Sequence, residues 1–128
     1  MSRFPLFGLL VATVLGINVA AAEEPVLHVY NWSDYSADEV LQQFQSETGL
    51  RVVYDVYDTN EVLEAKLLAG HSGYDLVFPT ARPFGQRHAK AGIYLELDKR
   101  KISNYAGLDP LLMENLAEVD HGNAYLVT

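Results

Sequence analysis

The sequence predicts an α/β domain built on a parallel β-sheet, and the order of its segments is the main reason. Three short runs rich in β-branched and aromatic residues, at 26–30, 51–57 and 74–78, alternate with stretches of helical periodicity. An alternation of strand and helix produces parallel strands with helices on the sheet faces. The length of 128 residues allows one domain at most, and a hydrophobic content of 49% is sufficient for a packed core.

The composition excludes several classes of protein. The chain has no cysteine, which excludes a disulfide-stabilised scaffold, a thiolate metal site and a lipid carried on cysteine. Its formal charge of −8 argues against a nucleic-acid binder held by basic side chains. An acidic surplus fits either a solvated surface or a cationic partner, and composition alone does not choose between them.

The first 22 residues have the pattern of a secretory signal peptide. Arg3 precedes an uncharged, largely apolar stretch at 4–22 that ends in three alanines before a polar junction. This stretch is nearly long enough to span a bilayer, so a membrane anchor is the alternative. Helix-weakening residues within it, and the absence of a basic flank after Ala22, favour cleavage. We therefore expect residues 1–22 to be removed on export and residues 23–128 to form the mature domain.

The first two helices have recognisable ends. Ser36 and Glu39 have the spacing of a capping box, which predicts the start of the first helix, and Gly49 predicts its end. The second helix is expected to begin at Asp58, a candidate N-cap, and to end near Gly70.

The remaining chain is predicted to continue the alternation. A third helix is expected from Pro83 to about Gly92, and a weaker helix over 108–116. Segments 93–97 and 124–127 are candidate edge strands. No turn or cap follows the second of these segments. We therefore expect the chain to be a truncated part of a longer domain, and a natural final edge strand is the alternative.

The loop after the first predicted strand contains the strongest candidate binding residues. Ligands of open parallel sheets bind outside the carboxyl ends of the strands. Here the loop holds Trp32, the only tryptophan of the chain, followed by Ser33, Asp34 and Tyr35. An indole face attracts an ammonium group, and the Asp34 carboxylate can pair with the same charge. The alternative is structural: Trp32 covers the sheet end, and the polar residues fix the turn.

The ends of the other two strands carry further polar residues. The Thr80 hydroxyl follows the third strand and lies beside the first loop if the two strands are neighbours. A helix-entry cap is the alternative role for Thr80. Asp55 and Asp58 flank the end of the second strand, where we expect an exposed side chain and a helix cap rather than a catalytic pair.

The sequence carries no enzyme or metal signature. Its histidines lack ligand spacing, and it has neither a glycine-rich phosphate loop nor a nucleophile elbow. We therefore expect no metal, no cofactor and no catalysis, and a structural or exposed role for His28, His71, His88 and His121.

Two longer stretches carry a family resemblance. YNWSDY at 30–35 and DVYDTNEVLEAKLLAG at 55–70, followed by GYDLVFP at 73–79, resemble the polyamine-binding periplasmic proteins of ABC importers, of the putrescine and spermidine type. The resemblance extends over nearly all of 25–128. It implies the N-terminal lobe of a two-lobed, type II-like periplasmic-binding-protein fold. It also implies capture of a small cationic polyamine by a periplasmic monomer and delivery to an inner-membrane ABC permease.

The resemblance also assigns roles to five residues of this chain. Trp32 would stack on the alkyl-ammonium chain, and Asp34 would place a carboxylate near an amine. Ser33 and Tyr35 would contribute hydrogen bonds at an amine end, and Thr80 stands where the family has a serine after proline.

Two departures from the family pattern affect this interpretation. Arg82 would repel a polyamine unless it turns to solvent or pairs with an acid. The family's second lobe, with most of its ammonium-binding carboxylates, would lie beyond Thr128. Because a fold does not fix a function, an exported enzyme or interaction domain on the same fold is the alternative to a binding protein.

Overall fold

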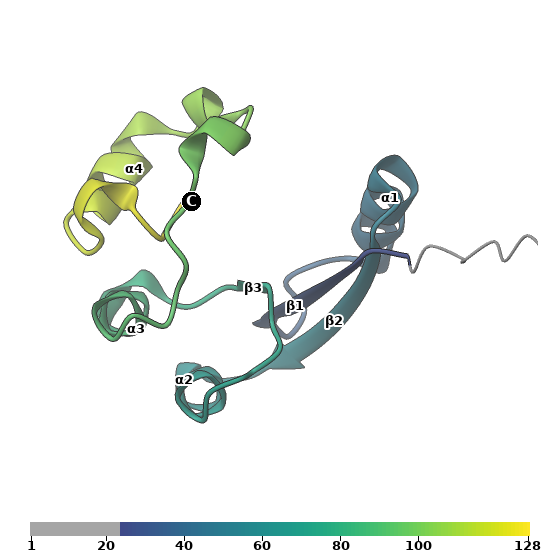
Figure 1. Ribbon diagram of the computed structural model, residues 1–128, viewed down its shortest axis with the longest axis horizontal. Coiled ribbons are helices and arrows are strands. Elements are labelled where there is room, and N and C mark those ends of the chain that lie inside the picture. Colours follow the sequence, from purple (N-terminus) through teal and green to yellow (C-terminus); the bar gives the residue numbers. More distant parts are fainter. Residues whose placement is uncertain (1–23) are drawn as a thin grey trace, which may run out of the picture.

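The computed structural model describes residues 24–128, and its centre is a small parallel sheet (Figure 1). Strands β1 (Val26–Trp32) and β2 (Arg51–Tyr57) pair along their whole length, so that the last residue of β1 lies opposite the last residue of β2. Strand β3 (Leu76–Val77) pairs with the other side of β1. The strand order is β2-β1-β3, and the parallel sheet predicted from the sequence is confirmed. The expected third strand is shorter than predicted.

The predicted signal peptide lies outside the described residues. Among residues 24–128, no helix has both the length and the apolar character needed to cross a bilayer.

Helix α1 (Asp38–Thr48) connects β1 to β2, and its predicted end is confirmed because Gly49 adopts a φ of 71°. The predicted capping box is wrong. The helix starts after Ala37, whose extended backbone takes the N-cap position, and no side chain caps it. The helix thus begins one residue later than the capping box requires, after a turn in which Asp34 adopts a φ of 60°.

Helix α2 (Asn60–Leu68) connects β2 to β3 and is capped by Thr59, whose hydroxyl accepts a hydrogen bond from the backbone N–H of Val62 at 3.3 Å. The prediction that Asp58 caps this helix is wrong. Its carboxylate instead accepts a hydrogen bond from the hydroxyl of Ser33, the residue that follows β1.

The chain after β3 is mostly helical. A segment at Ala81–Gly85, helical except for Arg82 with its extended backbone (φ −114°, ψ 132°), leads into α3 (Gln86–Lys90), and α4 (Pro110–Ala117) follows after two short 3₁₀ turns. These helices match the third and fourth helices predicted from the sequence. The two predicted edge strands at 93–97 and 124–127 do not form. The backbone N–H of Leu97 donates to the carbonyl of Ala124 at 2.7 Å, which is too little pairing to make a strand.

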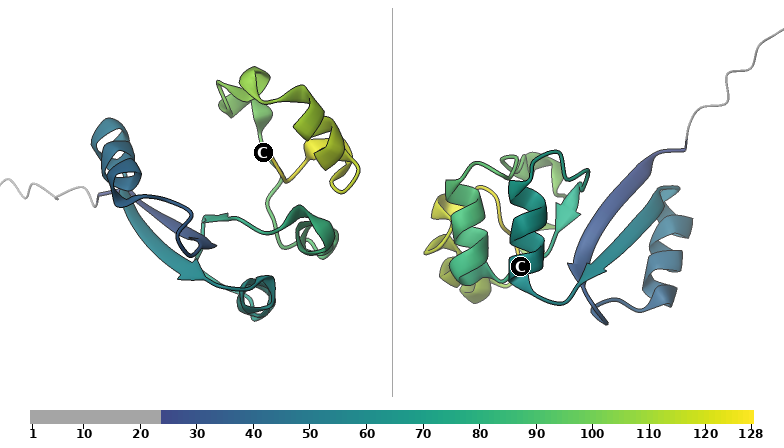
Figure 2. Two further views of the ribbon diagram at one scale, coloured as in Figure 1. Left: turned by 180° about the vertical axis from the view of Figure 1, so that it is seen from behind. Right: turned by 90° about the horizontal axis from the view of Figure 1, so that it is seen from below.

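The described residues form two separate hydrophobic clusters. The first lies between the sheet and α2 and contains Tyr30, Tyr57, Leu63 and Leu67. The second is formed by α4 and the residues after it, and contains Met113, Leu116 and Val119. Accordingly, α1 lies at one end of the molecule and α3 and α4 lie at the other, with the sheet between them (Figures 1 and 2).

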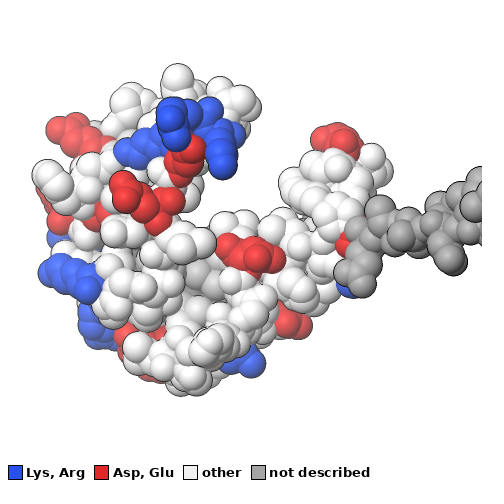
Figure 3. Space-filling view, in the orientation of Figure 1, with Lys and Arg blue, Asp and Glu red and all other residues white. Residues whose placement is uncertain are grey.

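The surface is hollowed between the sheet and the helical part (Figure 3). This hollow matches a cavity of about 830 Å³ bordered by the end of β1, by β3 and by α4. It contains the carboxyl ends of β1 and β3, which is the edge at which the sequence analysis placed the candidate binding residues.

Candidate ligand-binding site

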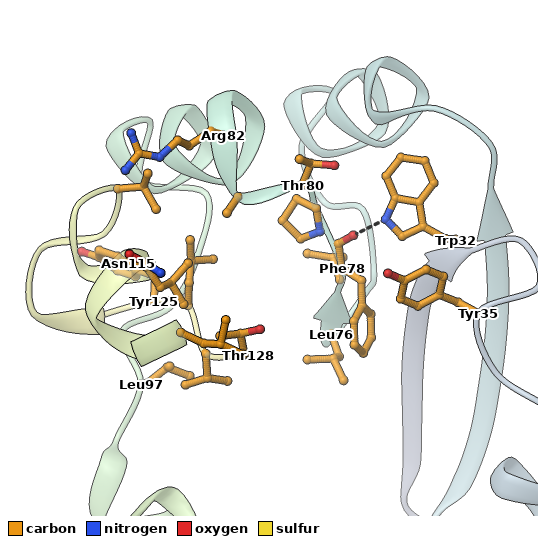
Figure 4. Close-up of a pocket in the computed structure, with 18 residues that line it drawn as sticks. Trp32, Tyr35, Leu76, Phe78, Thr80, Arg82, Leu97, Asn115, Tyr125 and Thr128 are labelled. Atoms are coloured by element: carbon orange, nitrogen blue, oxygen red, sulfur yellow. Dashed lines mark hydrogen bonds between the residues drawn. The ribbon is translucent and has the colours of Figure 1, made fainter. Parts of the chain in front are cut away.

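The cavity brings together three of the five residues selected from the sequence (Figure 4). Trp32, Tyr35 and Thr80 line one side of it. Because β1 and β3 are neighbours, Thr80 lies beside the loop that follows β1, as the strand order predicted. Ser33 and Asp34 are part of the same loop but do not line the cavity.

The indole of Trp32 is held by the neighbouring strands. Its Nε1 donates a hydrogen bond to the carbonyl of Phe78 at 2.8 Å, and its ring lies 4.7 Å from that of Tyr57, tilted by 51°. The hydroxyl of Tyr57 donates to the same Phe78 carbonyl. Burial raises the pKa of Tyr57 well above its ordinary value, so this hydroxyl stays protonated and remains a donor. The indole therefore has a fixed orientation while it borders the cavity.

Ser33 is tied to the end of β2. Its backbone N–H donates to the carbonyl of Tyr57 at 3.1 Å, and its hydroxyl donates to Oδ1 of Asp58 at 2.6 Å. Ser33 thus extends the pairing of β1 with β2 by one residue beyond the strands.

Asp34 and Tyr35 face the solvent. The Asp34 side chain is exposed, and within residues 24–128 it has no hydrogen bond or ion pair. Tyr35 is 71% exposed at the cavity border. A carboxylate and a phenol are therefore accessible in the loop that follows Trp32.

Thr80 is held by a reciprocal pair of hydrogen bonds with Asn60, the first residue of α2. The backbone N–H of Thr80 donates to Oδ1 of Asn60 at 3.0 Å, and Nδ2 of Asn60 donates to the Thr80 hydroxyl at 2.9 Å. Thr80 takes the N-cap position of the segment that follows, as the alternative interpretation expected, but its hydroxyl makes no capping hydrogen bond there.

The opposite side of the cavity is mainly apolar. It is formed by residues of α4 and by the last residues of the chain, including Leu112, Leu116 and Leu126. Among the described residues that line the cavity, Arg82 is the one charged side chain, and it forms an ion pair with Glu118. This is the pairing with an acid that the sequence analysis required for Arg82 to be compatible with a cation.

Sequence reasoning missed the contribution of the segment between β2 and α2. Tyr57, Asp58 and Asn60 each hold a candidate site residue or its partner, yet Asp58 was interpreted as a cap and the other two were given no role at the site. An available signal was the position of two Asx residues directly after a strand adjacent to the candidate loop. Asp55, predicted to be exposed, is exposed and accepts a hydrogen bond from the Tyr74 hydroxyl at 2.9 Å.

His88 is the one buried histidine among the described residues. Its Nδ1 lies 2.7 Å from the Tyr94 hydroxyl, and its Nε2 lies 3.4 Å from a carboxylate oxygen of Glu64. Burial lowers the pKa of His88, because the charged imidazolium loses its hydration there. Within residues 24–128 no three His, Asp or Glu side chains form a group that could hold a metal ion.

Comparison with known proteins finds relatives of one kind, although no protein-family model matches the chain. The chain is 50% identical, over 99% of its length, to the putrescine-binding periplasmic protein SpuD of Pseudomonas aeruginosa. It is 46% identical, over 94% of its length, to the putrescine-binding periplasmic protein PotF of Escherichia coli K12. The alignments cover 35% and 33% of those proteins, so the chain spans about a third of the length of the curated relatives it matches.

Solved structures agree with these relatives. The spermidine/putrescine ABC transporter substrate-binding protein PotD of Streptococcus pneumoniae matches with a TM-score of 0.73 and 32% identity, over 80% of this chain and 31% of that one. The TpPotD lipoprotein of Treponema pallidum matches with a TM-score of 0.67 and 34% identity, over 72% of this chain and 28% of that one. The resemblance predicted from the sequence is confirmed, and so is the periplasmic-binding-protein type of fold. The relatives are named as binding proteins, not enzymes.

Proposed function

We propose that this chain supplies one wall of a binding site for polyamines, as part of a periplasmic protein that delivers its ligand to an ABC permease. The observation that supports this most directly is Trp32, whose indole borders the cavity in an orientation fixed by the Phe78 carbonyl. An indole in this position combines apolar contact with the methylenes of a polyamine and attraction for its ammonium group.

The surroundings of Trp32 suit a cation that donates hydrogen bonds and accepts none. An ammonium group needs acceptors, and the hydroxyls of Ser33, Tyr35 and Thr80 can accept hydrogen bonds at this edge of the sheet. Asp34 supplies a carboxylate without a partner in residues 24–128, and its charge attracts the cation. These five residues are the ligand contacts that we propose: Trp32, Tyr35 and Thr80 line the cavity, and Ser33 and Asp34 lie between Trp32 and Tyr35 in the loop after β1.

The other wall cannot complete the site by itself. A polyamine carries at least two ammonium groups, and among the described residues the wall around α4 lines the cavity with no Asp or Glu side chain. Burying the second ammonium without an acid would cost more than the contacts with Trp32 return. We therefore propose that residues 23–128 act as the N-terminal lobe of a two-lobed, monomeric binding protein whose second lobe supplies further acids.

A chimera tests this function. Residues 24–128 replace the matching third of the Pseudomonas aeruginosa relative, and binding is measured by calorimetry with putrescine, with spermidine and with succinate as the anionic control. We expect the chimera to bind putrescine or spermidine and to ignore succinate, while the 128-residue chain alone shows no tight binding. A chimera that folds but binds neither polyamine would contradict the proposal, and so would micromolar binding by the chain alone.

A change at Asp34 tests the electrostatic part of the function. Asp34→Asn in the chimera should weaken putrescine binding, and the loss should be larger at low salt because screening of the charge pair is then weaker. A loss that does not depend on salt would contradict a charge pair between Asp34 and the ligand.

Export is a separate element of the proposal. We propose that residues 1–22 are a signal peptide cleaved near Ala22, which agrees with the periplasmic names of the relatives. N-terminal sequencing of the protein recovered from the periplasm should begin near Glu23. Recovery of membrane-bound protein with an intact Met1 would show an anchor instead.

A further inference from the structure

The segment from Tyr57 to Asn60 contacts the candidate site at three points. The Tyr57 hydroxyl shares the Phe78 carbonyl with Trp32, Asp58 bonds to Ser33, and Asn60 bonds to Thr80. We propose that Asp58 makes the Ser33 hydroxyl a hydrogen-bond acceptor toward the ligand, whereas Asn60 leaves the Thr80 hydroxyl able to donate. Asp58 thereby makes the Ser33 position selective for an ammonium group. This inference deepens the proposed function and rests on it.

Asp58 fixes Ser33 as an acceptor toward any ligand. A serine hydroxyl has one proton and two lone pairs, and an ionised carboxylate only accepts. At 2.6 Å from Oδ1 of Asp58, the single proton of Ser33 is committed to the carboxylate. The other acceptor within reach, the Tyr57 carbonyl at 3.5 Å, also belongs to the chain. Both lone pairs of Ser33 therefore remain for a ligand, and a ligand group meets no donor there.

Asn60 has the reverse effect on Thr80. A backbone N–H only donates, so the Asn60 atom that lies 3.0 Å from the Thr80 nitrogen must be the amide oxygen. This assignment leaves the amide nitrogen facing the Thr80 hydroxyl at 2.9 Å, where it donates. One lone pair of Thr80 is thus occupied, and the hydroxyl proton has no acceptor among the described residues. Thr80 can donate to a ligand or to water, whereas Ser33 cannot.

The two hydroxyls therefore suit different partners. An ammonium group has donors only and matches the two lone pairs of Ser33, with the negative charge of Asp58 directly behind them. An alcohol at the same place can donate one hydrogen bond, but it finds no donor for its own lone pairs and carries no charge to pair with Asp58. Asp58 is in this sense a positioning residue, which acts on the ligand through Ser33.

A pair of ligands of equal length tests the inference in the chimera described above. Putrescine and 4-aminobutan-1-ol differ by the replacement of one ammonium group with a hydroxyl, and the ratio of their affinities measures the selectivity. Asp58→Ala frees the Ser33 proton and removes the charge, so we expect the ratio to fall by about tenfold, the usual effect of a hydrogen bond to a charged group. Asp58→Asn keeps an oxygen that can accept the Ser33 proton, and we expect an intermediate ratio.

Three further variants show whether the effect passes through the hydroxyls. In a Ser33→Ala background, Asp58→Ala should change the ratio much less than it does alone. Asn60→Asp should raise the ratio. A carboxylate at this position still accepts from the Thr80 N–H, but it also accepts the Thr80 hydroxyl proton, so the hydroxyl then offers the ligand only lone pairs. Asp55→Ala removes a carboxylate of β2 that has no hydrogen bond with Ser33, and it should leave the ratio unchanged.

The outcomes separate the two proposals. If the wild-type chimera binds no polyamine, the proposed function is wrong and this inference falls with it. If putrescine binds and Asp58→Ala leaves the ratio unchanged, or if Asp55→Ala lowers it equally, only the inference is overturned. Emission from Trp32, the only tryptophan this chain contributes, and circular dichroism monitor folding. If Asp58→Ala does not fold, the affinity ratios of Asp58→Asn and Asn60→Asp test the inference in its place.

Discussion

The two walls of the cavity are stabilised in different ways. On the sheet wall, Trp32 and Thr80 are each bonded to a residue of a neighbouring element, and a cluster with Tyr57 and Leu63 at its centre lies beneath them. The wall formed by α4 has a cluster of three buried residues, and Leu111 and Leu112 of the same helix stay exposed. One wall is thus fixed by directional bonds, and the other depends mainly on limited apolar packing.

This difference assigns selective recognition of the ligand to the sheet wall and exclusion of water from the ligand to the α4 wall. Directional hydrogen bonds hold the Trp32 indole, the hydroxyls of Ser33 and Thr80 and the Asp58 carboxylate in a defined arrangement, which selective binding of a cation requires. An apolar wall adds surface and excludes water, but it discriminates poorly between ligands of similar shape. Changes on the sheet wall should therefore affect selectivity, and changes to the apolar side chains of α4 should affect mainly the local packing.

The largest effect is expected from the centre of the first cluster. Leu63 has no exposed surface and packs beneath the site residues, so Leu63→Ala should lower the free energy of unfolding by about 2–5 kcal/mol. Met113→Ala removes a side chain from the small cluster of α4, where neighbours can collapse into the space, and should cost less. Chemical denaturation followed by circular dichroism measures both losses.

Tryptophan emission sharpens this comparison, because Trp32 belongs to the sheet wall alone. Its emission spectrum in the native state should change in Leu63→Ala and stay unchanged in Met113→Ala. Equal changes in the two variants would show that the walls form one cooperative unit rather than two.

A smaller effect is expected for ligand contacts on the sheet wall. In the chimera, Trp32→Ala should weaken putrescine binding by about 1–2 kcal/mol, through lost cation–π attraction and methylene contact. Thr80→Ala removes a neutral hydroxyl and should cost less, within about 0.5–1.5 kcal/mol. Trp32→Phe keeps an aromatic face but loses the bond to the Phe78 carbonyl, so it should fall between them. Calorimetry measures the putrescine affinity of each variant. An unchanged affinity in Trp32→Ala would refute the stacking role of the indole.

The sheet wall is also the part of the fold that the sequence predicted best. The runs at 26–30 and 51–57 are dense in β-branched and aromatic residues, and both form strands because neighbouring strands satisfy their backbone groups. The segment at 124–127 has a similar composition but forms no strand. Composition alone does not make a strand without an adjacent partner to pair with, and the free edge of β3 lies across the cavity.

Part of the candidate site was predictable because it depends on the order of the strands. Trp32 and Thr80 were selected because they follow strands, and parallel strands bring their carboxyl ends to one edge. The roles of Asp58 and Asn60 depend on hydrogen bonds between elements that are 25 and 20 residues apart in the sequence, which spacing does not reveal. Local rules favoured a cap at Asp58, and the long-range bond to Ser33 prevailed because Thr59 caps the helix instead.

A pH effect is expected from His88, a buried residue of α3 whose ring faces Glu64 of α2. Its lowered pKa means that the unfolded chain takes up a proton near the ordinary value of about 6.5, whereas the folded chain does so only at lower pH. The stability contributed by neutral His88 is therefore present above that pH and is lost as the pH falls toward the folded-state pKa. Glu64, Arg87 and Tyr94 surround the ring.

Denaturation at pH 7.5 and 5.5 measures this effect. The wild-type chain should lose stability at the lower pH, and His88→Gln, which does not titrate, should lose less. His71→Gln, at an exposed position, is the matched control and should behave like wild type. An equal loss in wild type and His88→Gln would contradict the role assigned to His88.

The smallest effect is expected from the ion pair on the α4 side of the cavity. Arg82 and Glu118 are 59% and 67% exposed, so water screens their attraction, and Arg82→Gln should change the free energy of unfolding by about 0–1 kcal/mol. Its effect on binding should be clearer, because Arg82 is a cation on the cavity lining. In the chimera, Glu118→Gln leaves that cation unpaired and should weaken putrescine binding, whereas Arg82→Gln should leave it equal or stronger. Combining the two changes should restore the affinity of Arg82→Gln alone. If Glu118→Gln leaves putrescine affinity unchanged, the Arg82 charge does not reach the ligand, and the α4 wall contributes only apolar surface.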